Sequence, residues 1–418
     1  MITPGDTTTI MPLRDRAGMV NRWLGERIER ILPRLMEEEG IDAWVVAGRE
    51  YNEDPVLWTL LPRPMLSARR RTILLFFLRE PGKVEAISIC RYRMGSVYAD
   101  VWNPDLEDGW QCAANIIEEM DPDRIGINVS RLHGLADGMS ASELDMLRGV
   151  LPTHLGDRLV SAERLAIRWL ETRSPSELTA YPKIASVATR MMEIALSADV
   201  IHPGLSTTED VVWWLRERIH GAGLLAWFHP TVTIQARDLD WDDTSREIIM
   251  PGDLLHCDMG LKYLGLCTDN QRHAYVPRPG EAGIPRELQE LMDSANRLQD
   301  IVTSEFSPGR TGNQILYSAL ARAKIEGIEG SIYSHPLGYH GHAAGPAIGM
   351  WDSQEGVVGT GELPLHADTC YALELNARGS LRCFGDRGVR IALEEMISFD
   401  GKRVEYLSGR QSQPYIVS

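Results

Sequence analysis

Apolar positions in the first third of the chain alternate between a helical and a strand-like spacing. Residues 19–39 carry apolar side chains at helical spacing with charges between them, and residues 43–47 form a short apolar run typical of a strand. Further strand-like runs lie at 72–78, 84–89 and 124–128. Further helical runs lie at 113–119 and 141–147. This alternation predicts an α/β domain that ends near residue 165.

The second part of the chain begins with clear helix signals. Ser174 is suited to an N-cap, Pro175 to the first helical position, and Glu177 stands three residues after the cap, so a helix should start at Pro175. Ser206 or Thr207 should cap the next helix. Two further helices are expected at 285–306 and 312–324, and strand-like runs occur at 253–258, 266–276, 371–376 and 389–399. Short paired runs after residue 250 predict helices packed on a curved antiparallel sheet.

Length and composition limit the class of protein. At 418 residues the chain is long enough for two domains, and it has no apolar run of about 18 residues that would span a membrane. A formal net charge of -16 argues against a nucleic-acid surface. The first residues lack the basic and apolar segments of a secretory signal, so we expect a cytoplasmic protein.

Two aspartates stand out in the run from Asp253 to Asp269. If residues 253–269 form a tight hairpin with Tyr263 and Leu264 in its turn, facing residues have numbers that sum to 527, and Asp258 would lie opposite Asp269. Their Cβ atoms would then be roughly 5 Å apart, where two like charges are unfavourable unless a cation lies between them. Taken alone, the pair is better explained as loop or turn aspartates that point into water.

Two glutamates strengthen the case for a metal. Glu374 and Glu394 each lie within an apolar strand-like run, where a buried carboxylate is costly without a partner, although either could lie on an edge strand. Four carboxylates suit Mn²⁺ or Mg²⁺, and one imidazole widens the choice to Zn, Fe or Co.

The imidazole candidates are three histidines, His335, His340 and His342, in a segment rich in glycine and proline that continues to Pro346. This composition indicates a tight polar loop rather than a core helix. A metal-binding or catalytic loop is favoured over chance clustering.

Taken in order, these motifs resemble the creatinase, aminopeptidase P, prolidase and methionine aminopeptidase superfamily. Asp258-Met259-Gly260 is similar to its Asp-x-Gly motif, and Thr268-Asp269 opens a run, ending at Arg272, that is similar to its Thr-Asp-x-x-Arg motif. The His335 loop and the two glutamates follow in the family's order. The resemblance covers roughly residues 18–405 and implies a creatinase-type α/β N-terminal domain at 18–165 and an α+β pita-bread catalytic domain at 170–405.

The same resemblance implies the site residues. The metal ligands would be Asp258, Asp269, His335, Glu374 and Glu394. Glu374 would also act as general base and proton shuttle, and His342 would stabilise an oxyanion in the substrate. The cofactor would be two divalent ions, Mn first and Co, Zn or Fe as alternatives, which activate a shared water as a bridging hydroxide.

Several positions depart from the family pattern. Arg390 lies four residues before Glu394 instead of two, and it would either orient a substrate carboxylate or form a structural ion pair. Trp241 stands where the family has a substrate-contacting histidine. His229 is then either a substrate contact or a packed histidine, and His340 either lines the cleft or faces water.

Three functions are compatible with this pattern. The first is a metallopeptidase of the Xaa-Pro aminopeptidase or dipeptidase type, acting as a homodimer on peptides. The second, motivated by Trp241, is a creatinase-like C–N hydrolase or a lyase acting on a small molecule. The third, a metal-free binding module, is disfavoured because all five ligand positions are filled.

Overall fold

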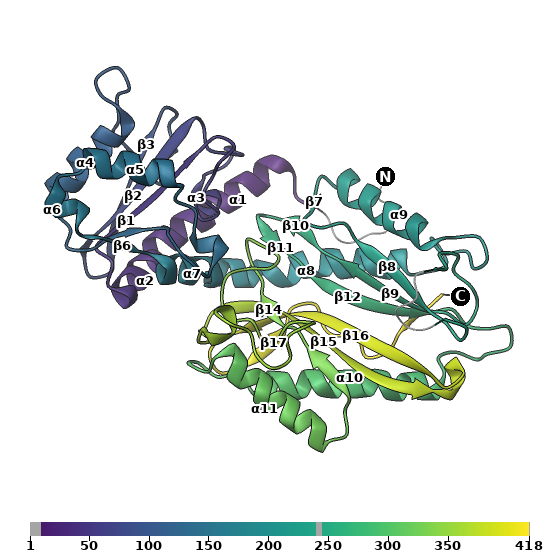
Figure 1. Ribbon diagram of the computed structural model, residues 1–418. Coiled ribbons are helices and arrows are strands. Elements are labelled where there is room, and N and C mark those ends of the chain that lie inside the picture. Colours follow the sequence, from purple (N-terminus) through teal and green to yellow (C-terminus); the bar gives the residue numbers. More distant parts are fainter. Residues whose placement is uncertain (1–9, 240–244, 418) are drawn as a thin grey trace. The chain divides into compact units, whose positions relative to one another are not determined.

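The computed structural model describes residues 10–239 and 245–417, and its contacts divide the chain into two compact units (Figure 1). The first unit is Met11–Glu177, and the second consists of the chain from Leu178 onward together with Ile10. Within the first unit, the buried carboxylate of Glu177 lies 2.9 Å from the guanidinium of Arg27, in an ion pair. The domain ranges 18–165 and 170–405 stay predictions.

The first unit is an α/β layer structure. Its sheet has the order β4-β3-β2-β1-β5-β6, with antiparallel pairing of β1 with β2 and of β2 with β3 and parallel pairing elsewhere. The strands are β1 Ala43–Arg49, β2 Arg71–Glu80, β3 Lys83–Cys90, β4 Ala99–Asp100, β5 Ile125–Ile127 and β6 Leu159–Ser161. The helices are α1 Leu13–Glu26, a π-helical turn Arg27–Ile31, α2 Leu32–Glu39, α3 Leu57–Leu60, α4 Gly109–Met120, a 3₁₀ turn Gly134–Ala136, α5 Ala141–Val150, α6 Thr153–Gly156 and α7 Glu163–Glu171.

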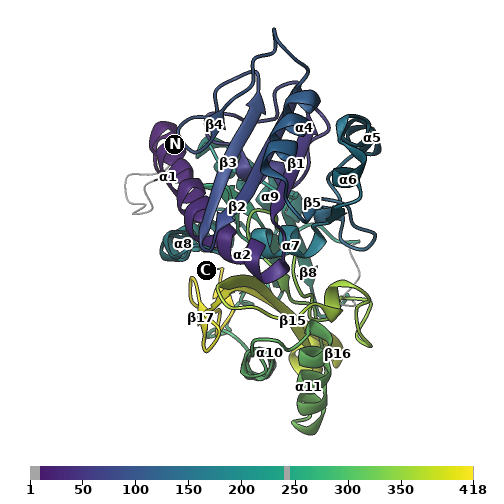
Figure 2. The ribbon, with the colours of Figure 1, turned by 90° about the vertical axis from the view of Figure 1, so that its left-hand side faces the viewer.

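Both faces of this sheet are covered by helices (Figure 2). Successive side chains of a strand point to opposite faces, so Val45 of β1 packs in the core formed with α4, while Trp44 contacts Phe76 and Trp169 on the other side. A strand buried on both faces explains why 43–47 is an uninterrupted apolar run.

The second unit contains the large sheet of the molecule. The sheet runs β13-β15-β16-β12-β9-β8, with β14, β17 and β18 attached, and all of its pairings are antiparallel except that of β12 with β18. Its strands are β8 Thr231–Gln235, β9 Leu254–Met259, β12 Asn270–Tyr275, β13 Gly330–Ile332, β14 His335–Pro336, β15 Thr369–Leu381, β16 Arg387–Phe399, β17 Val404–Tyr406 and β18 Tyr415–Ile416. A small second sheet consists of β7 Leu225–Ala226, β10 Leu261–Tyr263 and β11 Leu266–Cys267.

Helices pack against this sheet as the sequence predicts. They are α8 Pro175–Ala195, α9 Thr208–Gly221, α10 Arg286–Ser304 and α11 Gly312–Ile325, with 3₁₀ turns at Thr360–Glu362 and Arg382–Phe384. Figure 1 shows α10 and α11 along β15 and β16, where they share a core that includes Leu298, Leu316 and Leu373. The expected antiparallel sheet with packed helices is therefore confirmed. No helix in the described ranges combines the length and apolar character that crossing a membrane requires.

The predicted helix starts are confirmed by their capping bonds. Ser174 Oγ accepts from the Glu177 amide, and Glu177 returns a bond to the Ser174 amide. Thr207 caps α9 by the same reciprocal arrangement with Asp210. Such bonds satisfy amides that have no partner inside the helix, which is why these boundaries can be located from sequence.

The predicted hairpin register is wrong by one residue at the turn. The turn is Leu264-Gly265, both with positive φ, 55° and 85°, so facing residues sum to 529 rather than 527. A two-residue turn of this hand needs positive φ at both positions, and glycine adopts it at no cost. Asp258 consequently pairs with Gln271 and not with Asp269.

Candidate metal centre

Three of the predicted ligands lie in one row across adjacent strands. Gln271 of β12 faces Asp258 of β9 on one side and Glu394 of β16 on the other, and Glu394 faces Glu374 of β15. Residues directly opposite one another in a sheet point to the same face. The row therefore places three carboxylates on one side of the sheet.

The remaining two ligands come from interruptions of the strands. Asp269 lies in the gap between β11 and β12, where the backbone leaves the regular ladder, and His335 begins the short strand β14. His335 Nε2 lies 3.6 Å from an Asp269 oxygen and 3.5 Å from a Glu394 oxygen. The structure thus brings Asp269 to the site by the break in the ladder and not by the predicted cross-strand pairing.

All five predicted ligands converge. Ligand atoms lie within 4.8 Å of one another in each of three overlapping groups: Asp258, Asp269 and Glu394; His335, Glu374 and Glu394; and Asp269, His335 and His342. The predicted approach of the Asp258 and Asp269 carboxylates is confirmed, although the register from which it was argued is not.

The electrostatics of the site call for a positive charge. Burial, and then Glu394, raise the pKa of Glu374 to about 8, and burial raises that of Glu394 to about 8. Burial and the neighbouring carboxylates raise the pKa of Asp258 and Asp269 well above the usual range. A cation among these oxygens would reverse these shifts, because it favours the ionised form.

Unsatisfied polar atoms point to the same place. His335 Nε2 and Asp258 Oδ1 are buried without a hydrogen-bond partner among the described residues. His335 Nδ1 lies 3.1 Å from the backbone oxygen of Pro336, which orients the ring so that Nε2 faces the carboxylates. Buried polar atoms without partners are rare, and here they belong to the predicted ligands. The residues present therefore fit a site for divalent metal ions.

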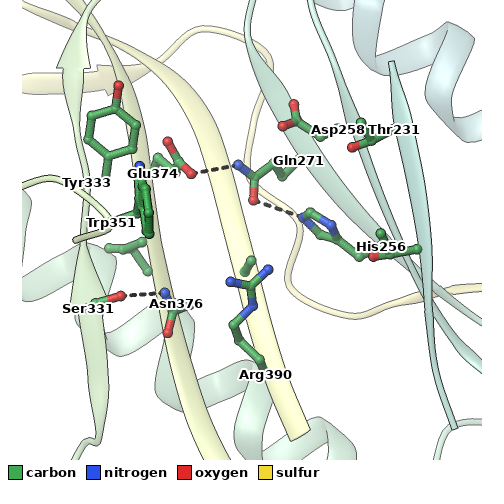
Figure 3. Close-up of a pocket in the computed structure, with 13 residues that line it drawn as sticks. Thr231, His256, Asp258, Gln271, Ser331, Tyr333, Trp351, Glu374, Asn376 and Arg390 are labelled. Atoms are coloured by element: carbon green, nitrogen blue, oxygen red, sulfur yellow. Dashed lines mark hydrogen bonds between the residues drawn. The ribbon is translucent and has the colours of Figure 1, made fainter. Parts of the chain in front are cut away.

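A polar pocket of about 260 Å³ opens beside the carboxylates (Figure 3). Asp258 and Glu374 lie at one end, and Arg390 projects into it from β16. Its other lining residues are Thr231, Thr233, His256, Gln271, Ser331, Tyr333, Trp351, Leu375, Asn376 and Ala392. The volume lies just below the range of about 300–1,000 Å³ that is usual for small-molecule sites, so the pocket suits a small polar ligand.

Gln271 and His256, which the sequence did not single out, line the pocket and are linked by hydrogen bonds to the proposed ligand Glu374. Gln271 donates to a Glu374 oxygen at 2.9 Å, and its own Oε1 lies 2.9 Å from His256 Nε2. Burial lowers the pKa of His256 to about 4, so the ring is neutral and donates to Gln271. The alternation of a strand carried the signal, because His256 lies two residues before Asp258 and hence on the same face.

The motif residues beyond the ligands also pair. Arg272 forms an ion pair with Glu395 at 2.7 Å, and both side chains are buried. Adjacent residues of β16 point to opposite faces, so Glu394 faces the metal centre while Glu395 anchors Arg272 behind it. This pair ties β12 to β16 beneath the ligand row.

The predicted substrate residues separate into two groups. Arg390 lines the pocket, and His342 lies beside the ligands with its ring 4.7 Å from that of His335. His342 is exposed, yet partial desolvation and then His335 lower its pKa to about 4. A neutral ring of this kind can donate one hydrogen bond.

The others do not reach the pocket in the described structure. His340 is half-buried in the loop and is not among the residues that line the pocket. His229 is exposed, with Nδ1 3.0 Å from a guanidinium nitrogen of Arg216 on α9. Trp241 lies outside the described residues. The substrate contacts expected of His340 and His229 find no support in their placement.

Comparisons with known proteins agree with this architecture. The profile of metallopeptidase family M24 matches residues 180–397, just over half of the chain. The structure is similar to an X-Pro aminopeptidase from Thermotoga maritima (TM-score 0.65, 16% identity, 92% of this chain and 100% of that one) and an Xaa-Pro dipeptidase from Bacillus anthracis (0.62, 18%, 94% and 100%). It is also similar to the dipeptidase PepE from Mycobacterium ulcerans (0.60, 19%, 96% and 98%). A sequence search of curated proteins gave no match.

Proposed function

The chain belongs to metallopeptidase family M24, a family of hydrolases, and its pita-bread domain follows an α/β N-terminal domain in the sequence. We propose that it is a dinuclear metallopeptidase that cleaves at Xaa-Pro bonds. The observation that carries this proposal is the convergence of four carboxylates and one imidazole on one face of the sheet. A solvated loop aspartate or an edge-strand glutamate would explain one of these residues by itself, but it would not explain why five of them from five separate segments meet.

The metal ions would be held by Asp258, Asp269, His335, Glu374 and Glu394. When bound, such ions lower the pKa of a shared water to near neutrality and polarise the scissile carbonyl. The four oxygen donors favour Mn²⁺, while the imidazole keeps Co, Zn and Fe as candidates.

The chain's own residues supply the proton transfers and the binding. Glu374, at the boundary between the ligands and the pocket, takes a proton from the attacking water and passes it to the leaving nitrogen. His342 donates a hydrogen bond to the developing oxyanion. Arg390, at the opposite end of the pocket from the ligands, holds a substrate carboxylate.

Support for an Xaa-Pro substrate comes from the structural neighbours. Two of the similar structures are an X-Pro aminopeptidase and an Xaa-Pro dipeptidase, and both are covered over their whole length. We extend this substrate class to the present chain and further propose that it works in the cytoplasm as a homodimer.

The pocket itself favours a second candidate. A volume of about 260 Å³ with a mainly polar lining would also suit a small amidino or carboxylate compound, cleaved at a C–N bond by the same residues. Both candidates use the same metal centre and differ only in the group bound at Arg390.

A substrate panel tests the proposal. The purified protein is loaded separately with Mn, Co, Zn or Fe and assayed against Xaa-Pro dipeptides, longer Xaa-Pro peptides, and small amidino and ester compounds. Turnover of the Xaa-Pro peptides, lost after chelation and restored by metal, is the expected result. Turnover of the small compounds alone would replace the peptidase by the second candidate, and an absence of bound metal would refute both.

A further inference from the structure

Trp227 lies between two segments next to the proposed metal centre, one containing Gly260 and Thr268 and the other containing Gly341. It directly follows β7, and its indole Nε1 donates to the Thr268 carbonyl at 2.7 Å, one residue before Asp269. A Cβ added to Gly260 would lie 2.0 Å from the indole nitrogen, and a Cβ added to Gly341 would lie 2.3 Å from the six-membered ring. Both glycines are therefore required by the indole.

The indole links three segments of the site. Gly260 ends the motif that begins at Asp258, Thr268 precedes Asp269, and Gly341 precedes His342. The backbone amide of Trp227 also bonds to the Gly260 carbonyl at 3.3 Å. One side chain thus fixes the spacing between the loop of the aspartates and the loop of the histidines.

The indole also makes a direct contact with His342. Their ring centroids are 5.3 Å apart and their planes cross at 79°, an edge-to-face arrangement. His335 contacts His342 in the same manner at 4.7 Å, and Tyr333 lies at 6.2 Å. An exposed histidine would otherwise sample several rotamers, so these rings define its direction.

We propose that Trp227 is a positioning residue that holds His342 in the orientation needed for its hydrogen bond to the substrate. This inference rests on the proposed function for the role of His342, but the orientation itself can be measured independently. The physical basis is that an oxyanion donor acts only at a fixed distance and angle, and a misplacement of about 1 Å can reduce the rate about 100-fold.

The kinetic test compares Trp227→Leu and Trp227→Phe in the metal-loaded protein. Leucine removes both the ring contact and the bond to Thr268, whereas phenylalanine keeps an aromatic face. We expect kcat to fall roughly 10-fold to 100-fold for Trp227→Leu and less for Trp227→Phe, with KM and the metal content unchanged. Trp213→Leu is the matched control, because Trp213 is 51% exposed on α9 and its ring contacts His229.

A double-mutant cycle separates positioning from general support of the fold. If Trp227 acts through His342, Trp227→Leu should cause little further loss of kcat in a His342→Ala background. Independent losses that multiply, or a loss of metal in Trp227→Leu with kcat per bound metal unchanged, would overturn the proposal. Should Trp227→Leu fail to fold, Trp227→Phe carries the same cycle.

A measurement without substrate keeps this inference distinct from the proposed function. In the Zn-loaded protein, the ring signals of ¹⁵N-labelled histidine are assigned to His342 by their disappearance in His342→Ala. Trp227→Leu should broaden or multiply these signals while those of His133, in the other unit, stay unchanged. Lack of Xaa-Pro turnover in the unaltered protein would refute the proposed function alone, whereas a single unaltered His342 signal in Trp227→Leu would refute the positioning role.

Discussion

Metal binding at this site should depend steeply on pH, because the ligands hold protons when no metal is present. Glu374 and Glu394 both have a pKa raised to about 8, first by burial. Below pH 7 each is therefore more than about 90% protonated, and a metal must displace both protons. The raised values of Asp258 and Asp269 act in the same direction.

The size of the effect follows from this count. Release of two protons makes the association constant rise roughly 100-fold for each pH unit between about pH 6 and 7.5, or about 2.7 kcal/mol per unit. In the metal-free protein the stability of the fold depends on pH in the opposite direction from the metal affinity: it falls as the pH rises. A raised carboxyl pKa stabilises the fold below the unfolded value of 4.5, and this stabilisation is lost as the pH rises through about 8.

Isothermal titration calorimetry measures the protons directly. Mn²⁺ is titrated into metal-free protein at pH 6.5 in buffers with different ionisation enthalpies, and the slope of the observed enthalpy gives the number of protons released. At least two are expected, and about one fewer for Glu374→Gln. Glu405→Gln, exposed on β17, is the control and should release the full number. An affinity that does not change between pH 6 and 7.5 would refute the reasoning.

Three further predictions follow from the same structure. Asp258→Asn should weaken metal binding sharply while leaving the metal-free fold as stable or more stable, as measured by elemental analysis and thermal unfolding, because it removes an anionic ligand from the metal but replaces a carboxyl that burial already keeps protonated in the metal-free protein. His342→Ala should keep its metals and lower kcat about 100-fold, whereas His335→Ala should lose metal; the opposite result would reverse the two assignments. In the first unit, burial raises the pKa of Asp54 to about 6, so its stabilising contribution, present below about pH 4, should disappear as the pH rises through 6. Calorimetry should show this loss, worth about 3 kcal/mol, in the unaltered protein and not in Asp54→Asn.

Features specified by neighbouring residues could be predicted from the sequence. The starts of α8 and α9 were located to within one residue because the capping side chains bond to amides three positions away. Apolar spacing alone also predicted that the first unit is α/β and that the second consists of helices packed on an antiparallel sheet. Local chemistry determines such features, so the rest of the fold does not need to be known.

Features that depend on strand register could not be predicted in the same way. A shift of the turn from Tyr263-Leu264 to Leu264-Gly265 moved Gln271 into the position opposite Asp258, where its amide bonds both His256 and Glu374. The predicted pairing would have left no place for this amide between the carboxylates. The amide matters because it donates a hydrogen bond to Glu374. Burial raises the pKa of this carboxyl, and the hydrogen bond from the uncharged amide partly offsets that rise.

The convergence of the five proposed ligands could nevertheless be predicted although the register was wrong, and the reason is physical. A buried carboxylate within an apolar strand is costly wherever its partner lies, so Glu374 and Glu394 signal a site without any knowledge of pairing. Trp227 gives no such signal, because an aromatic residue beside a strand is ordinary in any core. Its role depends on two glycines 33 and 114 positions away in the sequence, which leave room for an indole only when the two loops meet. Residues that bind charge can therefore be recognised from sequence, whereas residues that position them by shape require the structure.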